Sequence, residues 1–320
     1  MAAAESRRAL TRIVLIGTTA SGKSEVALGL ARKFGGEIIG ADSRQIYRGL
    51  EVGTAAPSPE ERLLAPHHFA SFLDPTEAYS AGRYGREARA AVLDCEARGR
   101  LAVVVGGSGL YIRALLEGLF EGPSRDDALR ARLAERLRAE GLTSLREELG
   151  RVDPEALVSI LPGDAVRVIR ALEVHELTGR RISDLRRQRA REPFSARVFG
   201  LRWPRAILAG RIAARLSRQL ASGFLDEANR LLTARLPDDA PGPRTLGYRE
   251  LIAHLRGETT LEEAAAAIIR KTRQLAKRQE TWFKRTAGVT WFSLEKEDDL
   301  ARVAEAIGSE ITRGGGQITC

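Results

Sequence analysis

The chain has 320 residues, of which 43% are hydrophobic and 29% charged, a composition typical of a soluble globular protein. No apolar run approaches the roughly 18 residues of a membrane span, residues 1–8 lack a signal-peptide core, and two cysteines without metal-ligand spacing suit a reducing cytoplasm. The excess of 51 basic over 42 acidic residues gives a net charge of +9 and favours a polyanionic partner.

Residues 13–24 predict a phosphate-binding loop. A short apolar run rich in β-branched residues, Ile13 to Ile16, leads directly into the spacing G-x-x-x-x-G-K-S, from Gly17 to Ser24, and then into a helical apolar pattern. In this context, backbone N–H groups and the helix N-terminus converge on a phosphate group. Lys23 adds a positive charge, and the Ser24 hydroxyl can bind Mg²⁺. Which molecule carries the phosphates stays open at this point.

A second predicted strand, 37–41, delivers Asp42 to its carboxyl end, where ligands bind in parallel α/β sheets. Asp42 is therefore a candidate for catalysis, although a helix N-cap is an open alternative because aspartate is a preferred N-cap residue. After a loop-like segment at 49–66, we expect a strand at 67–73, a helix at 81–98 and a buried strand at 101–105. The last strand ends in Gly106-Gly107-Ser108-Gly109 instead of an acid that holds magnesium, which disfavours a motor-type ATPase.

From 122 to 195 the pattern becomes helical, with helices expected at 128–140, 144–149, 154–161 and 165–177. We predict an all-helical insertion domain over 122–195, between two parts of an α/β core at 1–121 and 196–320. A strand at 198–203 returns the chain to a P-loop NTPase-like parallel sheet flanked by helices. Two helices at 206–222 and 260–285, a strand at 289–294 and a final helix follow, and the glycine-rich tail at 314–316 is predicted to be disordered.

Basic residues gather in three places away from the phosphate loop in sequence. Arg211, Arg215 and Arg218 share one face of the helix at 206–222, which is either a solvated face or a phosphate clamp. Six arginines lie within 180–191, including Arg189 and Arg191. The helix at 260–285 carries seven cations and one acid from residue 270 onward. An ordinary wet amphipathic face is one explanation, but contact with a nucleic-acid backbone is favoured.

A set of short motifs runs through nearly the whole chain. They are Gly17-Thr18-Thr19-Ala20-Ser21-Gly22-Lys23-Ser24, Asp42-Ser43-Arg44-Gln45-Ile46-Tyr47-Arg48-Gly49, Gly106-Gly107-Ser108-Gly109-Leu110-Tyr111, Gly247-Tyr248 and Lys277-Arg278-Gln279-x-x-Trp282-Phe283. Together and in this order, they resemble the bacterial tRNA dimethylallyltransferase family. The family's corresponding patterns are G-P-T-A-S-G-K-[ST], D-S-x-Q-x-Y-x-G, G-G-T-G-L-Y, G-Y and K-R-Q-x-T-W-[FL].

The resemblance implies transfer of a dimethylallyl group from dimethylallyl diphosphate to the exocyclic amine of the adenosine 3′-adjacent to the tRNA anticodon. It implies a monomer with Mg²⁺ as cofactor, held by Ser24, and a diphosphate bound by the loop from Gly17 to Ser24 with Arg211. Asp42 would accept a proton from the amine. A P-loop kinase of a nucleoside or small metabolite is the alternative function, and an RNA-binding module with a relict loop is a third.

Further catalytic roles implied by the resemblance fall to Thr19 and Arg215 at the diphosphate and to Ser108 at the tRNA or the reacting centre. The target base must leave its stack to reach the site. The tRNA-binding residues implied are Asp42, Ser43, Arg44, Gln45, Ser108, Val166, Arg167, Arg170, Arg244, Gly247, Tyr248, Arg249, Lys277, Arg278, Gln279, Trp282 and Lys284. This chain departs from the family pattern at Thr18, Ala56, Leu161, Gly163 and Val166, the last three in a region that faces tRNA in the family.

Overall fold

The computed structural model describes residues 12–119, 122–123, 126–187 and 194–313. It forms two compact units, one of Met1–Leu115 with Ser195–Cys320 and one of Leu116–Phe194. The sequence analysis placed the corresponding divisions at 121/122 and 195/196. The tail at 314–316 and two of the clustered arginines, Arg189 and Arg191, lie outside the described residues. Among the residues that the structure describes, none of the helices combines the length and the hydrophobicity of a membrane-spanning segment.

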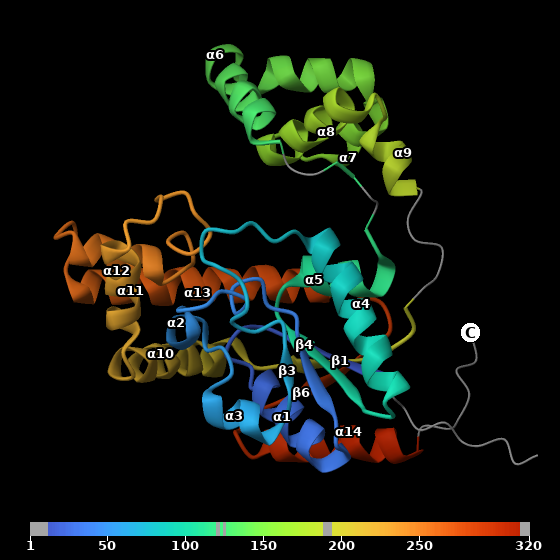
Figure 1. The fold of residues 1–320 in the computed structure, drawn as a ribbon, viewed down its shortest axis with the longest axis vertical. Helices are drawn as coiled ribbons and strands as arrows, with labels where there is room; N and C mark the ends of the chain where they lie inside the picture. Colours follow the sequence, from blue (N-terminus) through green and yellow to red (C-terminus); the bar gives the residue numbers. More distant parts are fainter. Residues whose placement is uncertain (1–11, 120–121, 124–125, 188–193, 314–320) are drawn as a thin grey trace, which may run out of the picture. The chain divides into compact units, whose positions relative to one another are not determined.

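A parallel sheet of six strands forms the centre of the first unit (Figure 1). The strands are β1 (Arg12–Gly17), β2 (Glu37–Gly40), β3 (His67–His68), β4 (Ala102–Gly106), β5 (Arg197–Arg202) and β6 (Val289–Ser293). They lie in the order β3-β2-β4-β1-β5-β6, and every neighbouring pair is parallel. All-parallel sheets bury both faces, which explains the continuous apolar runs in β1 and β4. The predicted α/β fold class is confirmed.

Strand β3 is much shorter than the strand predicted at 67–73, because only His67 and His68 pair with β2. Phe69 and Ser71 adopt φ angles of 58° and 50°, in the left-handed region that a strand does not accommodate. The chain turns here and bonds to the segment after β2 instead. The Ser71 N–H donates to the Gln45 carbonyl over 2.8 Å.

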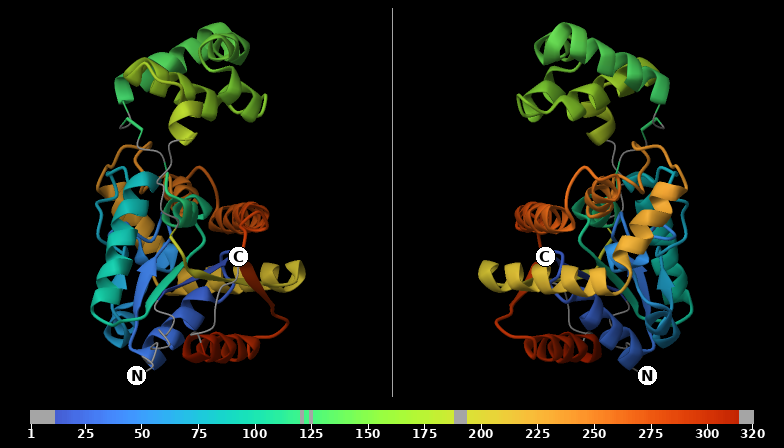
Figure 2. Two further views of the ribbon diagram at one scale, coloured as in Figure 1. Left: turned by 90° about the vertical axis from the view of Figure 1, so that its right-hand side faces the viewer. Right: turned by 90° about the vertical axis from the view of Figure 1, so that its left-hand side faces the viewer.

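Helices cover both faces of the sheet (Figure 2). Helices α1 (Lys23–Phe34) and α14 (Asp299–Arg313) pack against Ile13, Leu15 and Val103 on one face. Helix α4 (Ala81–Ala97) covers the opposite face, and α5 (Gly109–Glu117) begins directly after β4. The segment predicted as a loop at 49–66 contains two short helices, α2 (Glu51–Thr54) and α3 (Pro59–Leu64). Helix α3 starts with a Ser58 capping box and a proline, which are recognisable helix-start signals.

A second core lies among four helices that follow β5: α10 (Arg205–Ala221), α11 (Phe224–Thr233), α12 (Tyr248–Leu255) and α13 (Leu261–Phe283). The predicted helices at 206–222 and 260–285 match α10 and α13 to within two residues. Helices α11 and α12 were not predicted. Phe224, Tyr248 and Ile268 meet in this core, which also holds the apolar residues of the segment after β2.

The second unit is all-helical, with α6 (Asp127–Val152), α7 (Pro154–Ser159), α8 (Ala165–Thr178) and α9 (Ile182–Arg187). Helix α6 joins the two helices predicted at 128–140 and 144–149 across a kink at Gly141. The core of this helical unit includes Leu133, Leu145 and Leu172.

Glu173 is a buried acid in the same unit. Burial alone would raise the pKa of its carboxyl, but hydrogen bonds from Arg130 and Arg170 lower it to about 2.

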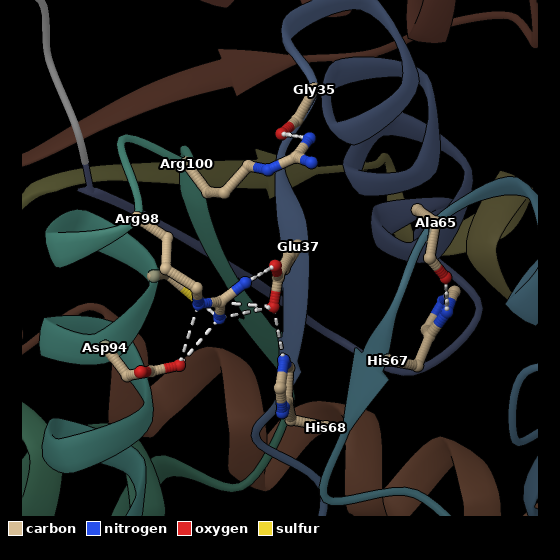
Figure 3. A network of polar contacts seen from close by, with 9 residues as sticks. Gly35, Glu37, Ala65, His67, His68, Asp94, Arg98 and Arg100 are labelled. Carbon is tan, nitrogen blue, oxygen red and sulfur yellow. Dashed lines mark hydrogen bonds and ion pairs between the residues drawn. The ribbon is translucent and has the colours of Figure 1, made fainter.

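An ion-pair network surrounds Glu37, the first residue of β2 (Figure 3). Arg98 donates to both carboxylate oxygens of the buried Glu37, and His68 Nε2 lies 2.8 Å from one of them. Hydrogen bonding by Arg98 is the main cause that lowers the pKa of Glu37 to about 2. Ligand atoms of Glu37, His68 and Cys95 lie within 4.8 Å of one another. Arg98 pairs with the Glu37 carboxylate, and burial raises the pKa of the Cys95 thiol to about 11, so an ion pair holds this cluster together.

Candidate active site

The loop from Gly17 to Ser24 joins β1 to α1, as predicted. Gly22 is the N-cap of α1 with a φ of 86°, and a Cβ there would lie 2.7 Å from Leu300, so glycine is required. The Trp203 indole N–H donates to the Ser21 carbonyl over 3.0 Å. Pinned in this way at the end of a helix, the loop presents backbone N–H groups and the positive end of the α1 dipole to an anion.

Lys23 lies at the base of this loop and provides its positive charge. Its Nζ donates to the Thr18 carbonyl over 2.6 Å. Desolvation lowers the pKa of Lys23 to about 8, while the nearby Asp42 raises it and Arg215 lowers it further. A desolvated ammonium group attracts an anion strongly, because little water must be removed when the two meet.

Asp42 follows β2 at the carboxyl edge of the sheet. Its Oδ1 accepts the Arg44 N–H over 2.9 Å and so begins a turn, not a helix, which excludes the N-cap alternative. Ser108 follows the neighbouring strand β4, and its Oγ accepts the Ser43 N–H over 2.9 Å. The turns that follow β2 and β4 are therefore hydrogen-bonded to each other, which keeps Asp42 and Ser108 close together at the carboxyl edge of the sheet.

Two arginines of α10 point to the phosphate loop. Arg215 donates to Thr19 Oγ1 over 3.2 Å and to the Thr54 carbonyl over 3.0 Å. Arg211 donates to the Ala20 carbonyl over 2.8 Å and stacks on Trp203, with its guanidinium 4.4 Å from the ring centroid. Burial lowers the pKa of both guanidinium groups. Neither side chain is therefore part of a fully solvated face, and Arg211 also pairs with Glu297.

The last turns of helix α13 contact the phosphate loop and the turn after β4. The Thr19 N–H donates to Gln279 Oε1 over 2.8 Å, and Gln279 Nε2 donates to the Gly107 carbonyl over 2.9 Å. A Cβ on Gly109 would lie 2.3 Å from Trp282, so this helix packs directly on the turn after β4.

These elements enclose a cavity of about 1020 Å³. Its lining includes Thr19, Lys23, Ser24, Asp42, Arg211, Arg215, Arg218 and Gln279, together with an apolar group formed by Ile212, Leu216, Phe224, Ile268, Ile269 and Leu275. The cavity thus combines a cationic phosphate-binding end, a carboxylate at a strand end and an apolar wall. It suits a ligand with a diphosphate and a hydrocarbon part.

Comparison with known proteins gives one consistent result. A family model described as IPP transferase matches residues 45–286, and a second, described as isopentenyl transferase, matches residues 11–65. The chain belongs to the IPP transferase family. The resemblance recognised from the motifs is confirmed, and the P-loop NTPase-like fold of the family agrees with the sheet order found here.

Relatives of similar length support the assignment. A tRNA dimethylallyltransferase of Geobacter metallireducens is 44% identical over 284 residues, which is 88% of this chain and 92% of the relative. One of Anaeromyxobacter sp. (strain K) is 46% identical over 283 residues, 88% of this chain and 92% of the relative.

Two solved structures are similar as well. The tRNA isopentenylpyrophosphate transferase of Bacillus halodurans has 33% identity and a TM-score of 0.68, over 95% of this chain and 97% of that one. A eukaryotic dimethylallyltransferase described as acting on tRNA has 25% identity and a TM-score of 0.78, over 95% of this chain and 80% of that one.

The residues predicted to bind tRNA in this IPP transferase differ in accessibility. Eight are exposed: Arg44, Val166, Arg167, Arg244, Arg249, Lys277, Arg278 and Lys284. Seven are half-buried: Asp42, Ser43, Gln45, Ser108, Arg170, Gln279 and Trp282. Arg44 donates to the Pro241 carbonyl over 3.3 Å, which brings the turn after β2 beside the loop that carries Arg244. Val166, Arg167 and Arg170 belong to the separate helical unit.

Many of these residues already have partners within the protein. Gly247 and Tyr248 are buried, and the Tyr248 hydroxyl donates to Glu227 over 2.6 Å. Direct contact between the Tyr248 ring and tRNA is therefore not available in this structure. Arg170 pairs with Glu173 and donates to the Pro123 carbonyl over 3.0 Å, so it stabilises the helical unit.

Sequence reasoning missed two residues that hold the segment 52–55 against the site. Glu227 accepts the N–H groups of Val52 and Gly53, each over 2.9 Å, and Gln219 donates to the carbonyls of the same two residues. This segment supplies the Thr54 carbonyl that positions Arg215. One signal was available: Glu227 stands on the apolar face of its helix, among the buried Phe224, Ala228 and Leu231.

Proposed function

We propose that this protein transfers a dimethylallyl group from dimethylallyl diphosphate to the exocyclic amine of the adenosine 3′-adjacent to the tRNA anticodon. One observation carries the proposal: a phosphate loop, two half-buried arginines, a strand-end carboxylate and an apolar wall line one cavity in a chain of the IPP transferase family. The relatives are named tRNA dimethylallyltransferase, and from this name we take dimethylallyl as the transferred group and tRNA as its acceptor. The protein would act on tRNA as a monomer.

In this reaction the loop from Gly17 to Ser24 holds the diphosphate as a leaving group. Lys23, Arg211 and Arg215 stabilise the negative charge that develops as the bond between the allylic carbon and the diphosphate oxygen breaks. The structure supports this role because all three cations lie at the cationic end of the cavity and are partly desolvated. Thr19 contributes its hydroxyl, which Arg215 already orients.

Asp42 acts at the other reactant. The exocyclic amine of adenine is a weak nucleophile, so a carboxylate that orients it and accepts its proton helps the new carbon–nitrogen bond to form. Ser108 is bonded to the same turn and would contact the flipped nucleoside. The strand-end position of Asp42, fixed by the turn to Arg44, supports this division of roles.

Magnesium fits the donor groups of this cavity. Ser24 is exposed on the first turn of α1, and the carboxylates of Asp42 and Glu51 line the same space. Hydroxyl and carboxylate oxygens are ligands that Mg²⁺ accepts. Ser24 would hold the ion, whose contribution when bound is to neutralise charge on the diphosphate.

The exposed side of α13 is proposed to bind the tRNA backbone. Arg270, Arg273, Lys277, Arg278, Lys284 and Arg285 are exposed on this helix or directly after it. Lys284 pairs with Glu280, and Lys271 pairs with the buried Glu250. A dense row of unburied cations is typical of phosphate-backbone contact. A small-molecule kinase, the alternative, has no use for such a surface.

The test incubates the purified protein with radiolabelled dimethylallyl diphosphate, magnesium and total tRNA. Label that enters the tRNA supports the proposal. Consumption of ATP on a nucleoside, with no label in tRNA, would replace it with the kinase alternative.

A further inference from the structure

Gln279 connects the phosphate loop to the turn after β4 through both ends of its amide. Its Oε1 accepts the Thr19 N–H over 2.8 Å, and its Nε2 donates to the Gly107 carbonyl over 2.9 Å. The two partners fix which end of the amide is which, because the N–H group needs an acceptor and the carbonyl needs a donor. The Gln279 amide thus forms a hydrogen bond with the backbone of the phosphate loop.

Two close contacts place the Gln279 amide and the neighbouring Trp282 ring against glycines. A Cβ on Gly107 would lie 2.4 Å from Gln279 Nε2, so a larger residue at this position would displace the amide end. Trp282, one turn further along α13, lies against Gly109 in the same way. Ala276 and Phe283 lie on the same side of α13 as Gln279 and are buried. A displacement of α13 would therefore change the position of the amide relative to the loop.

The two residues before Gln279 face the other way. Lys277 and Arg278 are exposed cations, within the surface proposed to bind the tRNA backbone. One helical turn therefore carries cations toward solvent and a bidentate amide toward the phosphate loop. Thr19 is then held at two groups, since Gln279 accepts its N–H and Arg215 donates to its hydroxyl.

We propose that Gln279 is a positioning residue that couples tRNA binding on α13 to diphosphate binding in the loop. Phosphate contacts at Lys277 and Arg278 fix the helix, and the Gln279 amide passes this restraint to Thr19. A loop held in its binding conformation has less freedom to lose when the diphosphate enters. Coupling of this kind is reciprocal, so each ligand tightens the binding of the other by the same factor. The inference rests on the function proposed above.

The test measures binding without chemistry, by calorimetry of inorganic diphosphate with magnesium, in the absence and presence of a tRNA transcript with adenosine 3′ of its anticodon. We expect tRNA to tighten diphosphate binding about fivefold or more in the unchanged protein. In Gln279→Met, which keeps the length but loses both hydrogen bonds, the factor should fall below about two. Gln274→Met, an exposed glutamine on the same helix, is the control and should keep the original factor.

Gln279→Glu separates the two bonds. It keeps an acceptor for the Thr19 N–H but loses the donor to Gly107 and adds a negative charge, so it should weaken diphosphate binding even without tRNA. In turnover, Gln279→Met should raise the KM for dimethylallyl diphosphate more than it lowers kcat, while its Tm stays near that of the control. A coupling factor that is unchanged in Gln279→Met, or absent from the unchanged protein, would overturn the proposal. Failure of label transfer to tRNA would instead overturn the function on which it rests.

Discussion

Removal of the Arg215 guanidinium should damage the reaction more than any other change on α10. Arg215 lies against the phosphate loop through Thr19 and is partly desolvated, as the lowering of its pKa by burial indicates. Loss of one preorganised donor to a developing negative charge typically costs about 3–4 kcal/mol. We therefore expect Arg215→Ala to lower kcat/KM for dimethylallyl diphosphate by about 10²–10³-fold. Arg215→Lys should recover part of it, since lysine keeps the charge but not the planar fork.

The assay is steady-state transfer of labelled dimethylallyl groups at saturating tRNA, with thermal unfolding measured beside it. The variant also loses its bond to the Thr54 carbonyl, which costs about 1–3 kcal/mol of stability, and the two effects must be separated. Arg205→Ala is the matched control, because this arginine is on the same helix with a side chain that is 80% exposed. If Arg215→Ala stayed within about threefold of the control in kcat/KM, the assignment of Arg215 to the diphosphate would be wrong.

Three further predictions concern charge. Lys23 has a pKa of about 8, so kcat/KM for dimethylallyl diphosphate should fall above pH 8 as the ammonium group loses its proton. Lys23→Arg should give a lower kcat/KM that does not change with pH in this range. The same fall in kcat/KM at alkaline pH in both proteins would refute this. The pKa of Glu37 is about 2 in the fold against 4.5 ordinarily, so its stabilisation is present above pH 4.5 and lost as pH falls toward 2. Because Arg98 is partly exposed, Glu37→Gln should cost only about 1–2 kcal/mol at pH 7, with unfolding curves that converge with those of the unchanged protein in acid. Lys277→Ala with Arg278→Ala should raise the KM for tRNA and flatten its salt dependence; if only the KM for the prenyl donor moved, this surface would not be the tRNA site.

Local sequence signals predicted the phosphate loop and the carboxylate at the end of β2. Both depend on short spacings: a strand, a glycine-rich turn and a helix N-terminus follow one another within residues 12–34. Helical periodicity predicted that Arg211 and Arg215 share a face. It could not say what covers that face, because the answer depends on a loop nearly 200 residues away.

Tertiary contacts explain what the sequence did not predict. Gln279 was assigned to tRNA from its motif, yet its amide bonds to Thr19, a residue 260 positions earlier. Tyr248 was expected at the RNA surface, but its ring fills the core beside Phe224, with ring centroids 4.8 Å apart. The strand predicted at 67–73 stopped early because Phe69 and Ser71 adopt left-handed backbone angles, for which their side chains give no signal.

Analysis of the tRNA product tests the central claim most directly. After incubation with dimethylallyl diphosphate, the tRNA is digested to nucleosides and examined by mass spectrometry. The account predicts that the adenosine next to the anticodon carries one dimethylallyl group in place of an amine hydrogen. It also predicts that Asp42→Ala gives none of this product while still binding tRNA. Unmodified adenosine with the unchanged protein, or full modification by Asp42→Ala, would contradict it.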